Sequence, residues 1–153
     1  MPNEIPGLAE DLQPIAQYIS MKRDEIARET SYLREDRKRA VERPDKAIEY
    51  AERLAEAFHA DEEERTSILH EFTDIDWIDE KIAGQNEIMS NLTELIEDLK
   101  ENIHEPVLEF LKGQLFAEEA VPMIEGVSAE YRERKAGEIR ALRTYIRTIE
   151  KKL

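Results

Sequence analysis

Apolar residues recur every three or four positions along nearly the whole chain, and this spacing constrains the fold more than any other feature. A helix places residues with that spacing on one face, whereas a half-buried strand needs apolar and polar residues to alternate. β-Branched residues never alternate with polar ones over the length of a strand, and only 5 Gly and 6 Pro interrupt the 153 residues. The sequence therefore predicts an all-α protein without a sheet.

Pro, Gly and helix-capping residues divide this pattern into about five helices. The first helix ends before Pro44, Gly84 closes the third, and Asn86 caps the fourth, so we expect a turn between these last two. Pro106 has no backbone N–H and kinks or restarts the fourth helix, which Gly113 ends. The predicted helices span residues 8–43, 46–59, 62–83, 87–113 and 123–152 within a single domain of residues 1–153. Short connections favour antiparallel neighbours. We predict an elongated antiparallel helical bundle with long, coiled-coil-like first and last helices.

The composition excludes several classes of enzyme. The chain has no Cys and 3 His, which leaves no thiol nucleophile, zinc knuckle or iron–sulfur cluster. It contains no Gly-rich phosphate loop, no GxSxG and no HExxH motif. Nowhere do eighteen apolar residues run together, and the first residues have no apolar leader pattern, so we expect no membrane span and a cytoplasmic location.

Charge is distributed unevenly along the chain. The net charge of −14 argues against general nucleic-acid binding, because phosphates would be repelled, and it suits a basic partner. Residues 44–131 hold 6 Lys and Arg against 24 Asp and Glu, whereas residues 132–153 hold 8 against 3. Cations of the last helix recur at three and four residues and form one basic stripe: Arg140, Arg143, Arg147 and Lys151. The stripe either lies against the chain's own acidic helices around residues 94–105 or faces outward to engage phosphate or an acidic partner.

Glu71, Trp77, Glu101 and His104 form a candidate metal site. Glu-x-x-His on a helix puts a carboxylate and an imidazole on neighbouring positions of one face, the arrangement with which helical bundles hold iron. The turn expected near Gly84 would bring Glu71 and Glu101 to within roughly 5 Å of the same axial level, at a rise of about 1.5 Å per residue. Glu101 and His104 point away from the apolar stripe of their helix, so they could meet a metal only at a second interface.

The segment HEFTDIDWIDEK followed by KENIHE resembles the encapsulated ferritins over about residues 70–115. In that family the subunit is a two-helix hairpin with a ligand Glu before a DW-x-D element and a Glu-x-x-His on the next helix. The resemblance implies ferroxidase chemistry on iron at a site shared between two subunits, with Glu71, Glu101 and His104 as ligands and Trp77 beside them. In the alternative interpretation, the Glu-x-x-His pair is a solvated helix face and Trp77 is a partial core anchor or an interface residue.

The absence of catalytic motifs favours a non-enzymatic function. We expect a helical protein–protein interaction module, such as an adaptor, a small complex subunit or an inhibitor, that associates with itself or with a helical or basic partner protein. Trp77 and the basic stripe are the predicted contact residues. Two alternatives are open: the ferritin-like metal protein, whose cofactor would be iron, and an acidic decoy that occupies a basic nucleic-acid-binding surface.

Overall fold

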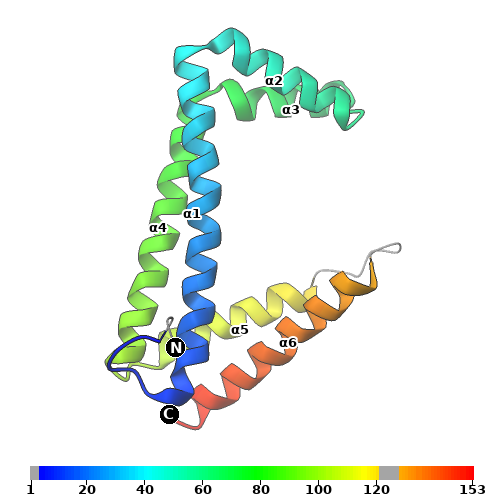
Figure 1. Cartoon of the computed structure of the whole chain (residues 1–153). Coiled ribbons are helices and arrows are strands. Elements are labelled where there is room, and N and C mark those ends of the chain that lie inside the picture. The colour runs from blue at the N-terminus through cyan, green and yellow to red at the C-terminus, as the bar shows by residue number, and fades with distance from the viewer. Residues whose placement is uncertain (1–3, 121–127) are drawn as a thin grey trace. The chain divides into compact units, whose positions relative to one another are not determined.

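The computed structural model describes residues 4–120 and 128–153 of the chain. Over these residues it consists of six α-helices and one short 3-10 helix and has no strand, which confirms the predicted all-α fold (Figure 1). The helices are α1 (Gln13–Glu42), α2 (Pro44–Ala57), α3 (Glu62–Thr73), α4 (Ile75–Lys100), α5 (Glu105–Ala120) and α6 (Ala129–Glu150), and the 3-10 helix η1 is Glu10–Leu12. None of the helices in this described part is both long enough and apolar enough to cross a membrane.

The chain forms two compact units, where the sequence predicted one domain. The α5–α6 unit comprises the described residues of 1–21 and 92–153. The α2–α3 unit comprises residues 22–91. The division falls inside α1, after Met21, and inside α4, after Asn91, so each of these two helices contributes one segment to either unit.

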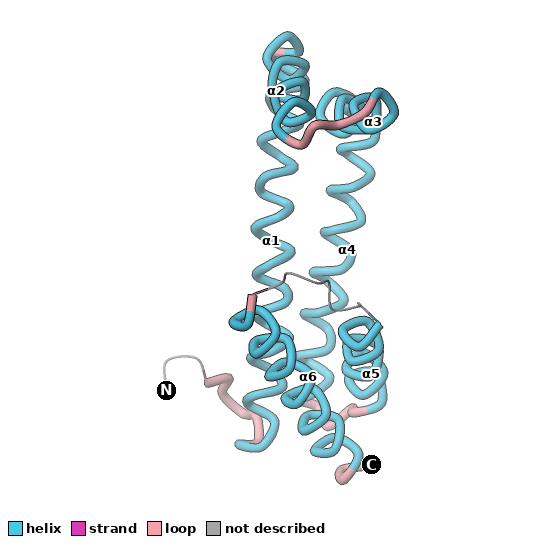
Figure 2. The backbone as a smooth tube through the Cα atoms, turned by 90° about the vertical axis from the view of Figure 1, so that its right-hand side faces the viewer, coloured by secondary structure: helices cyan, strands magenta, loops and turns pink. Residues whose placement is uncertain are grey.

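The α5–α6 unit has a core of large aliphatic side chains. α5 and α6 lie side by side and antiparallel (Figures 1 and 2), and ion pairs join Lys112 to Glu150 at 4.0 Å and Arg143 to Glu119 at 2.8 Å. All four helical segments of the unit contribute fully buried residues: Leu12, Ile15, Ile19, Leu99, Val107, Leu111, Leu142 and Ile149. Burial of a side chain of this size stabilises a fold by about 1.5–3 kcal/mol, so this unit carries most of the apolar burial of the described chain.

Apolar residues recur at three- and four-residue spacing over residues 88–103, along α4 and the turn after it, but only those in the middle of this range are buried. Leu92, Ile96 and Leu99 are buried, Leu95 is half-buried, and Ile88 and Ile103 at the two ends of the range are exposed.

α4 ends in a Schellman motif, and four residues separate it from α5. Asn102 lies in the left-handed region with a φ of 62°. The N–H of Ile103 donates to the carbonyl of Asp98 at 2.8 Å, and the N–H of Asn102 donates to the carbonyl of Leu99 at 3.3 Å. Pro106 lies in the first turn of α5, where its missing N–H leaves no helical bond unmade. The sequence predicted that Pro106 either kinks one helix or starts a new one. In the structure it lies at the start of a new helix, α5.

The α2–α3 unit contains a helical hairpin held by small residues. α2 and α3 lie side by side (Figure 1), and α2 buries only alanines against its neighbours, namely Ala47, Ala51 and Ala55. α3 contains no fully buried residue. The rings of Tyr50 and Phe72 meet edge to face across the hairpin with centroids 5.2 Å apart. Close approach through alanine lets two short helices pair but buries little apolar area.

The segments of α1 and α4 in the same unit run antiparallel (Figure 2), and polar side chains join them. Arg37 forms an ion pair with Asp79, Arg34 bonds Asn86 at 3.4 Å, and Gln85 bonds Glu29 at 3.4 Å. A small apolar cluster lies beyond these contacts. It consists of the buried residues Ala40, Ala47 and Ile78, with Ile75, Trp77 and Ile82 partly buried against them.

Several predicted helix boundaries are wrong. Asp74 ends α3 and caps α4, because its carboxylate accepts a hydrogen bond from the N–H of Trp77 at 3.1 Å. α4 then continues without interruption through Gly84, so the turn expected there does not form, and α5 continues past Gly113 to Ala120. Glycine inside a helix costs only about 1 kcal/mol relative to Ala, which the packing of a long helix outweighs.

The last helix begins at Ala129 in the described residues, and its expected start at residue 123 lies outside them. The first helix is long, as expected, but the second-longest described helix is α4 and not the last one. α1 has 30 residues and α4 has 26, against 22 for α6.

Candidate interaction surfaces

The α2–α3 unit has a thin core. Of the ten largest fully buried side chains among the described residues, only Thr30 and Ile78 belong to this unit. Its other buried apolar residues are all alanines: Ala40, Ala47, Ala51, Ala55 and Ala60. A unit of 70 residues ordinarily buries more large side chains than this before it is stable alone.

Large apolar side chains of the same unit are exposed instead. Phe58 at the end of α2 is 72% exposed, and Tyr32 on α1 is 65% exposed. The hairpin contributes four exposed residues, which we call the hairpin apolar set: Ile48, Tyr50, Phe58 and Leu69. Exposed apolar surface beside an incomplete core is typical of a protein–protein contact surface.

Trp77, the predicted contact residue, is half-buried at the start of α4. Its ring packs beside the cluster around Ile78, with the ring of His70 at 5.8 Å between centroids and the ammonium of Lys81 5.4 Å from its centroid. Whether Trp77 also contacts a partner stays a prediction.

α1 reaches the hairpin through a cation and a ring. The guanidinium of Arg39 lies 4.6 Å from the centroid of the Tyr50 ring and 3.2 Å from the carboxylate of Asp36. Burial raises the pKa of the Asp36 carboxyl above its usual value, although the nearby Arg39 charge opposes this shift. The contact holds one face of Tyr50, while 42% of the residue remains exposed.

The outward face of α2 carries a row of carboxylates that we call the acidic row: Asp45, Glu49, Glu52 and Glu56. Spacings of four, three and four residues place these side chains on one helix face. Glu49 pairs with Lys46 at 3.3 Å and with Arg53 at 2.6 Å, whereas the other three form no ion pair with any described residue. Residues 44–74 as a whole hold 10 Asp and Glu against 3 Lys and Arg.

The basic stripe of α6 is exposed along its whole length. Arg143 pairs with Glu119 on α5, not with any of the acidic residues expected between 94 and 105. The guanidinium of Arg147 bonds only the carbonyl of Arg143, at 3.3 Å, and neither Arg140 nor Lys151 pairs with a described carboxylate. Most of the stripe therefore has no acidic partner in the described part of the α5–α6 unit.

The structure places the three proposed iron ligands in two different units. Glu71 lies on α3 in one unit, and Glu101 and His104 lie between α4 and α5 in the other. The expected hairpin between Glu71 and Glu101 is wrong, because Gly84 lies inside α4. Over the described ranges, no three His, Asp or Glu side chains are arranged to hold a metal. An iron site shared between two subunits involves a second chain and stays a prediction.

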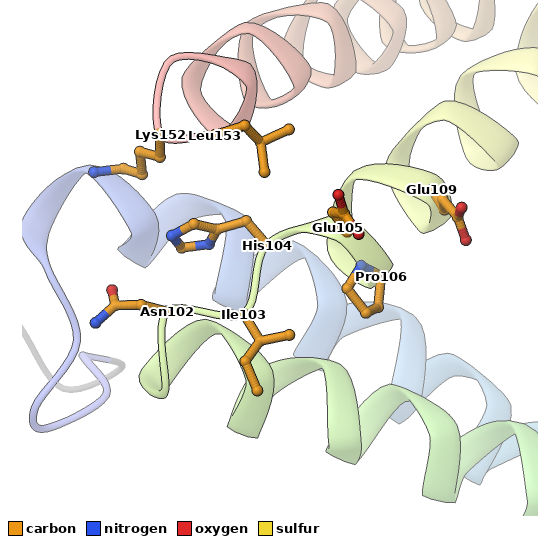
Figure 3. Close-up of a pocket in the computed structure, with 8 residues that line it drawn as sticks. All are labelled: Asn102, Ile103, His104, Glu105, Pro106, Glu109, Lys152 and Leu153. Carbon is orange, nitrogen blue, oxygen red and sulfur yellow. The ribbon is translucent and has the colours of Figure 1, made fainter.

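His104 is buried beside a surface hollow of about 520 Å³ (Figure 3). Its Nδ1 atom has no hydrogen-bond partner, and its ring points away from Glu105 and Glu109, which line the other side of the hollow. Lys152 also lines the hollow, but its ammonium pairs with Asp11 at 2.8 Å. Since the polar groups do not converge on one point, the hollow lacks the arrangement of a small-molecule site.

The hairpin apolar set was missed in the sequence because Ile48 and Phe58 fall on the apolar spacing expected of core residues. The only available signal was the run of alanines on α2, which leaves little depth for burying larger neighbours.

Comparisons of the chain with protein-family models, with curated proteins and with solved structures found no match.

Proposed function

We propose that this chain is a non-enzymatic helical protein–protein interaction module of the cytoplasm, acting as an adaptor, a small complex subunit or an inhibitor. Its contact surface is the hairpin apolar set on α2 and α3. One observation carries the proposal: the α2–α3 unit buries alanines and a single large aliphatic residue, Ile78, while it exposes Ile48, Tyr50, Phe58 and Leu69.

Burial of these side chains against a partner would supply the buried apolar area that the α2–α3 unit lacks. Each aromatic or aliphatic residue of this size gains about 1.5–3 kcal/mol when it is fully removed from water, before the costs of association are subtracted. Aromatic anchors also dominate binding energy at interfaces. The α5–α6 unit, with its core of large aliphatic side chains, has no comparable deficit and serves as the stable body of the module.

Affinity capture with a matched pair of variants tests the proposal. Ile48→Ser with Phe58→Ser removes two residues of the hairpin apolar set that are 42% and 72% exposed. Phe116→Ser with Tyr131→Ser removes side chains that are 76% and 43% exposed, both in the α5–α6 unit. Tagged chains are incubated with extract of the source cells, and the retained proteins are quantified by mass spectrometry.

We expect the wild-type chain and the Phe116 variant to retain the same stoichiometric partner and the Phe58 variant to lose it. Circular dichroism checks that all three chains are equally helical. Amides of α2 and α3 should also exchange hydrogen more slowly once the purified partner is added. If the Phe58 variant retains the same partner in the same amount, the assignment of this surface is incorrect.

A further inference from the structure

The acidic row of α2 and the basic stripe of α6 match in length. Asp45 to Glu56 and Arg140 to Lys151 each span eleven residues, or about 16 Å at a rise of 1.5 Å per residue. Each set lies on one face of its helix, because all its spacings are three or four residues. Two exposed stripes of opposite charge and equal length can lie along each other.

The register of the two sets agrees when the helices are antiparallel. Counted from Asp45, the carboxylates fall at offsets of 0, 4, 7 and 11 residues, and counted backward from Lys151, the cations fall at 0, 4, 8 and 11. Three pairs are level, and the fourth differs by one residue, or about 1.5 Å, which the length of an arginine side chain spans. Antiparallel helix dipoles favour this orientation over the parallel one.

Each set is neutralised at only one of its four members by ion pairs in its own unit. Asp45, Glu52 and Glu56 form no ion pair with described residues, and neither do Arg140 and Lys151. Residues 44–74 carry a net charge of −7, and residues 129–153 hold 8 Lys and Arg against 4 Asp and Glu. Like charges in one row repel each other, and an oppositely charged row relieves this repulsion.

We propose that the basic stripe of α6 docks on the acidic row of α2 in a second copy of this chain. The inference rests on the proposed function and names the partner of the hairpin. Charge steers the two helices together and sets their register, since exposed ion pairs alone add little affinity. Arginine stems cover apolar surface, and guanidinium groups stack on aromatic rings. Phe58 directly follows α2, two residues after Glu56, and Arg39 already makes such a contact with Tyr50 in the same unit.

A charge-swap experiment tests the pairing. One variant carries Arg140→Glu with Arg147→Glu, and the other carries Glu52→Lys with Glu56→Lys. The control, Arg28→Glu with Lys38→Glu, makes the same change in net charge as the first variant, at exposed cations of α1. Mass in solution is measured by sedimentation equilibrium at low and high NaCl concentration for each chain and for mixtures.

We expect the wild-type chain and the control to self-associate at low salt and to dissociate as salt rises. Each charge variant alone should associate at least about tenfold more weakly, because like charges then face each other. An equimolar mixture of the two variants should recover the mass of the complex, since each supplies the row that the other has lost. A chain that combines all four substitutions should likewise self-associate.

Three results would overturn the proposal. They are a wild-type chain that is monomeric at every concentration and salt, self-association that the reversals do not change, and variants whose mixture fails to associate. Preferential capture of a short DNA or RNA duplex by the wild-type stripe would assign it to nucleic acid instead. A monomeric chain that still retains a different protein through Phe58 would refute the second copy as partner and leave the proposed function intact.

The orientation can be tested because the natural chain has no Cys. Glu56→Cys with Arg140→Cys should form an intermolecular disulfide under mild oxidation if the helices are antiparallel. Glu56→Cys with Lys151→Cys should cross-link poorly. Cross-linking of the second pair alone would show a parallel arrangement and contradict the register derived above.

Discussion

His59 occupies a backbone conformation that costs free energy. It lies in the left-handed region with a φ of 51°, between α2 and α3. Its N–H donates to the carbonyl of Glu56 at 3.1 Å, and the N–H of Ala60 donates to the carbonyl of Ala55 at 2.9 Å. This is a Schellman motif, in which glycine is the usual residue at the left-handed position. The hairpin therefore forms with a strained residue at its turn.

His59→Gly should raise the free energy of unfolding by about 0.5–1 kcal/mol. The left-handed conformation costs an L-residue about 1–2 kcal/mol, and the greater flexibility of glycine in the unfolded chain takes back part of the gain. Asn102→Gly is the matched control. It occupies the same position at the end of α4 with a φ of 62°, but asparagine tolerates that conformation and should gain less. Urea unfolding followed by circular dichroism measures both, and a larger gain at Asn102 would contradict this account.

At the scale of helices, two glycines that were predicted to end helices lie inside them instead. Gly84 and Gly113 lie inside α4 and α5, both are exposed, and a Cβ added at either would meet no atom within 4 Å. Alanine at these positions avoids the entropy cost of glycine in a helix without any steric clash.

Gly84→Ala and Gly113→Ala should each raise the free energy of unfolding by about 0.5–1 kcal/mol. The measurement at Gly84 also tests whether α4 is continuous there, because alanine would destabilise a tight turn at this position. Urea denaturation of the two single variants and the double variant gives the values. The two positions are in different units and should be additive. A loss of stability at Gly84 would favour the turn predicted from the sequence over the continuous helix.

The sequence predicts helix formation well and helix boundaries poorly, for a physical reason. Apolar spacing reports which face of a helix is buried, and Leu92 and Leu99, which lie seven residues apart on α4, are both buried. The position of a helix boundary depends on free-energy differences of about 1 kcal/mol between ending the helix at one residue and ending it at another. Asp74 ends one helix and caps the next through a single hydrogen bond to the N–H of Trp77, and no glycine or proline marks that position.

At the scale of the whole molecule, the division into units could not be read from the sequence. Domain boundaries are recognised in linkers rich in proline, glycine or polar residues, whereas here they fall after Met21 and Asn91 inside helices. The candidate surfaces were predicted in part. Helical spacing identified the basic stripe of α6, but the exposed position of Phe58 depends on how little α3 buries, which is a property of packing.

The two units should differ in local stability, because their cores differ in size. Amides of α2 and α3 depend on the alanines of the hairpin and on the cluster around Ile78, whereas amides of α5 and α6 are backed by large buried aliphatic residues. Local opening takes less free energy where less apolar area is buried. Hydrogen exchange followed by mass spectrometry at high salt, where the proposed ion pairs are screened, should show α2 and α3 exchanging at least about tenfold faster than α5 and α6.

A core substitution provides the control for this measurement. Leu111→Ala removes a fully buried side chain of α5 and should cost about 2–5 kcal/mol. The loss should accelerate exchange in α5 and α6 and leave the faster exchange of α2 and α3 nearly unchanged, if the units open independently. Equal protection of both helix pairs in the wild-type chain would mean that the α2–α3 unit is stable without further burial. The exposed hairpin apolar set would then need no partner, and the main argument for an interaction surface there would fail.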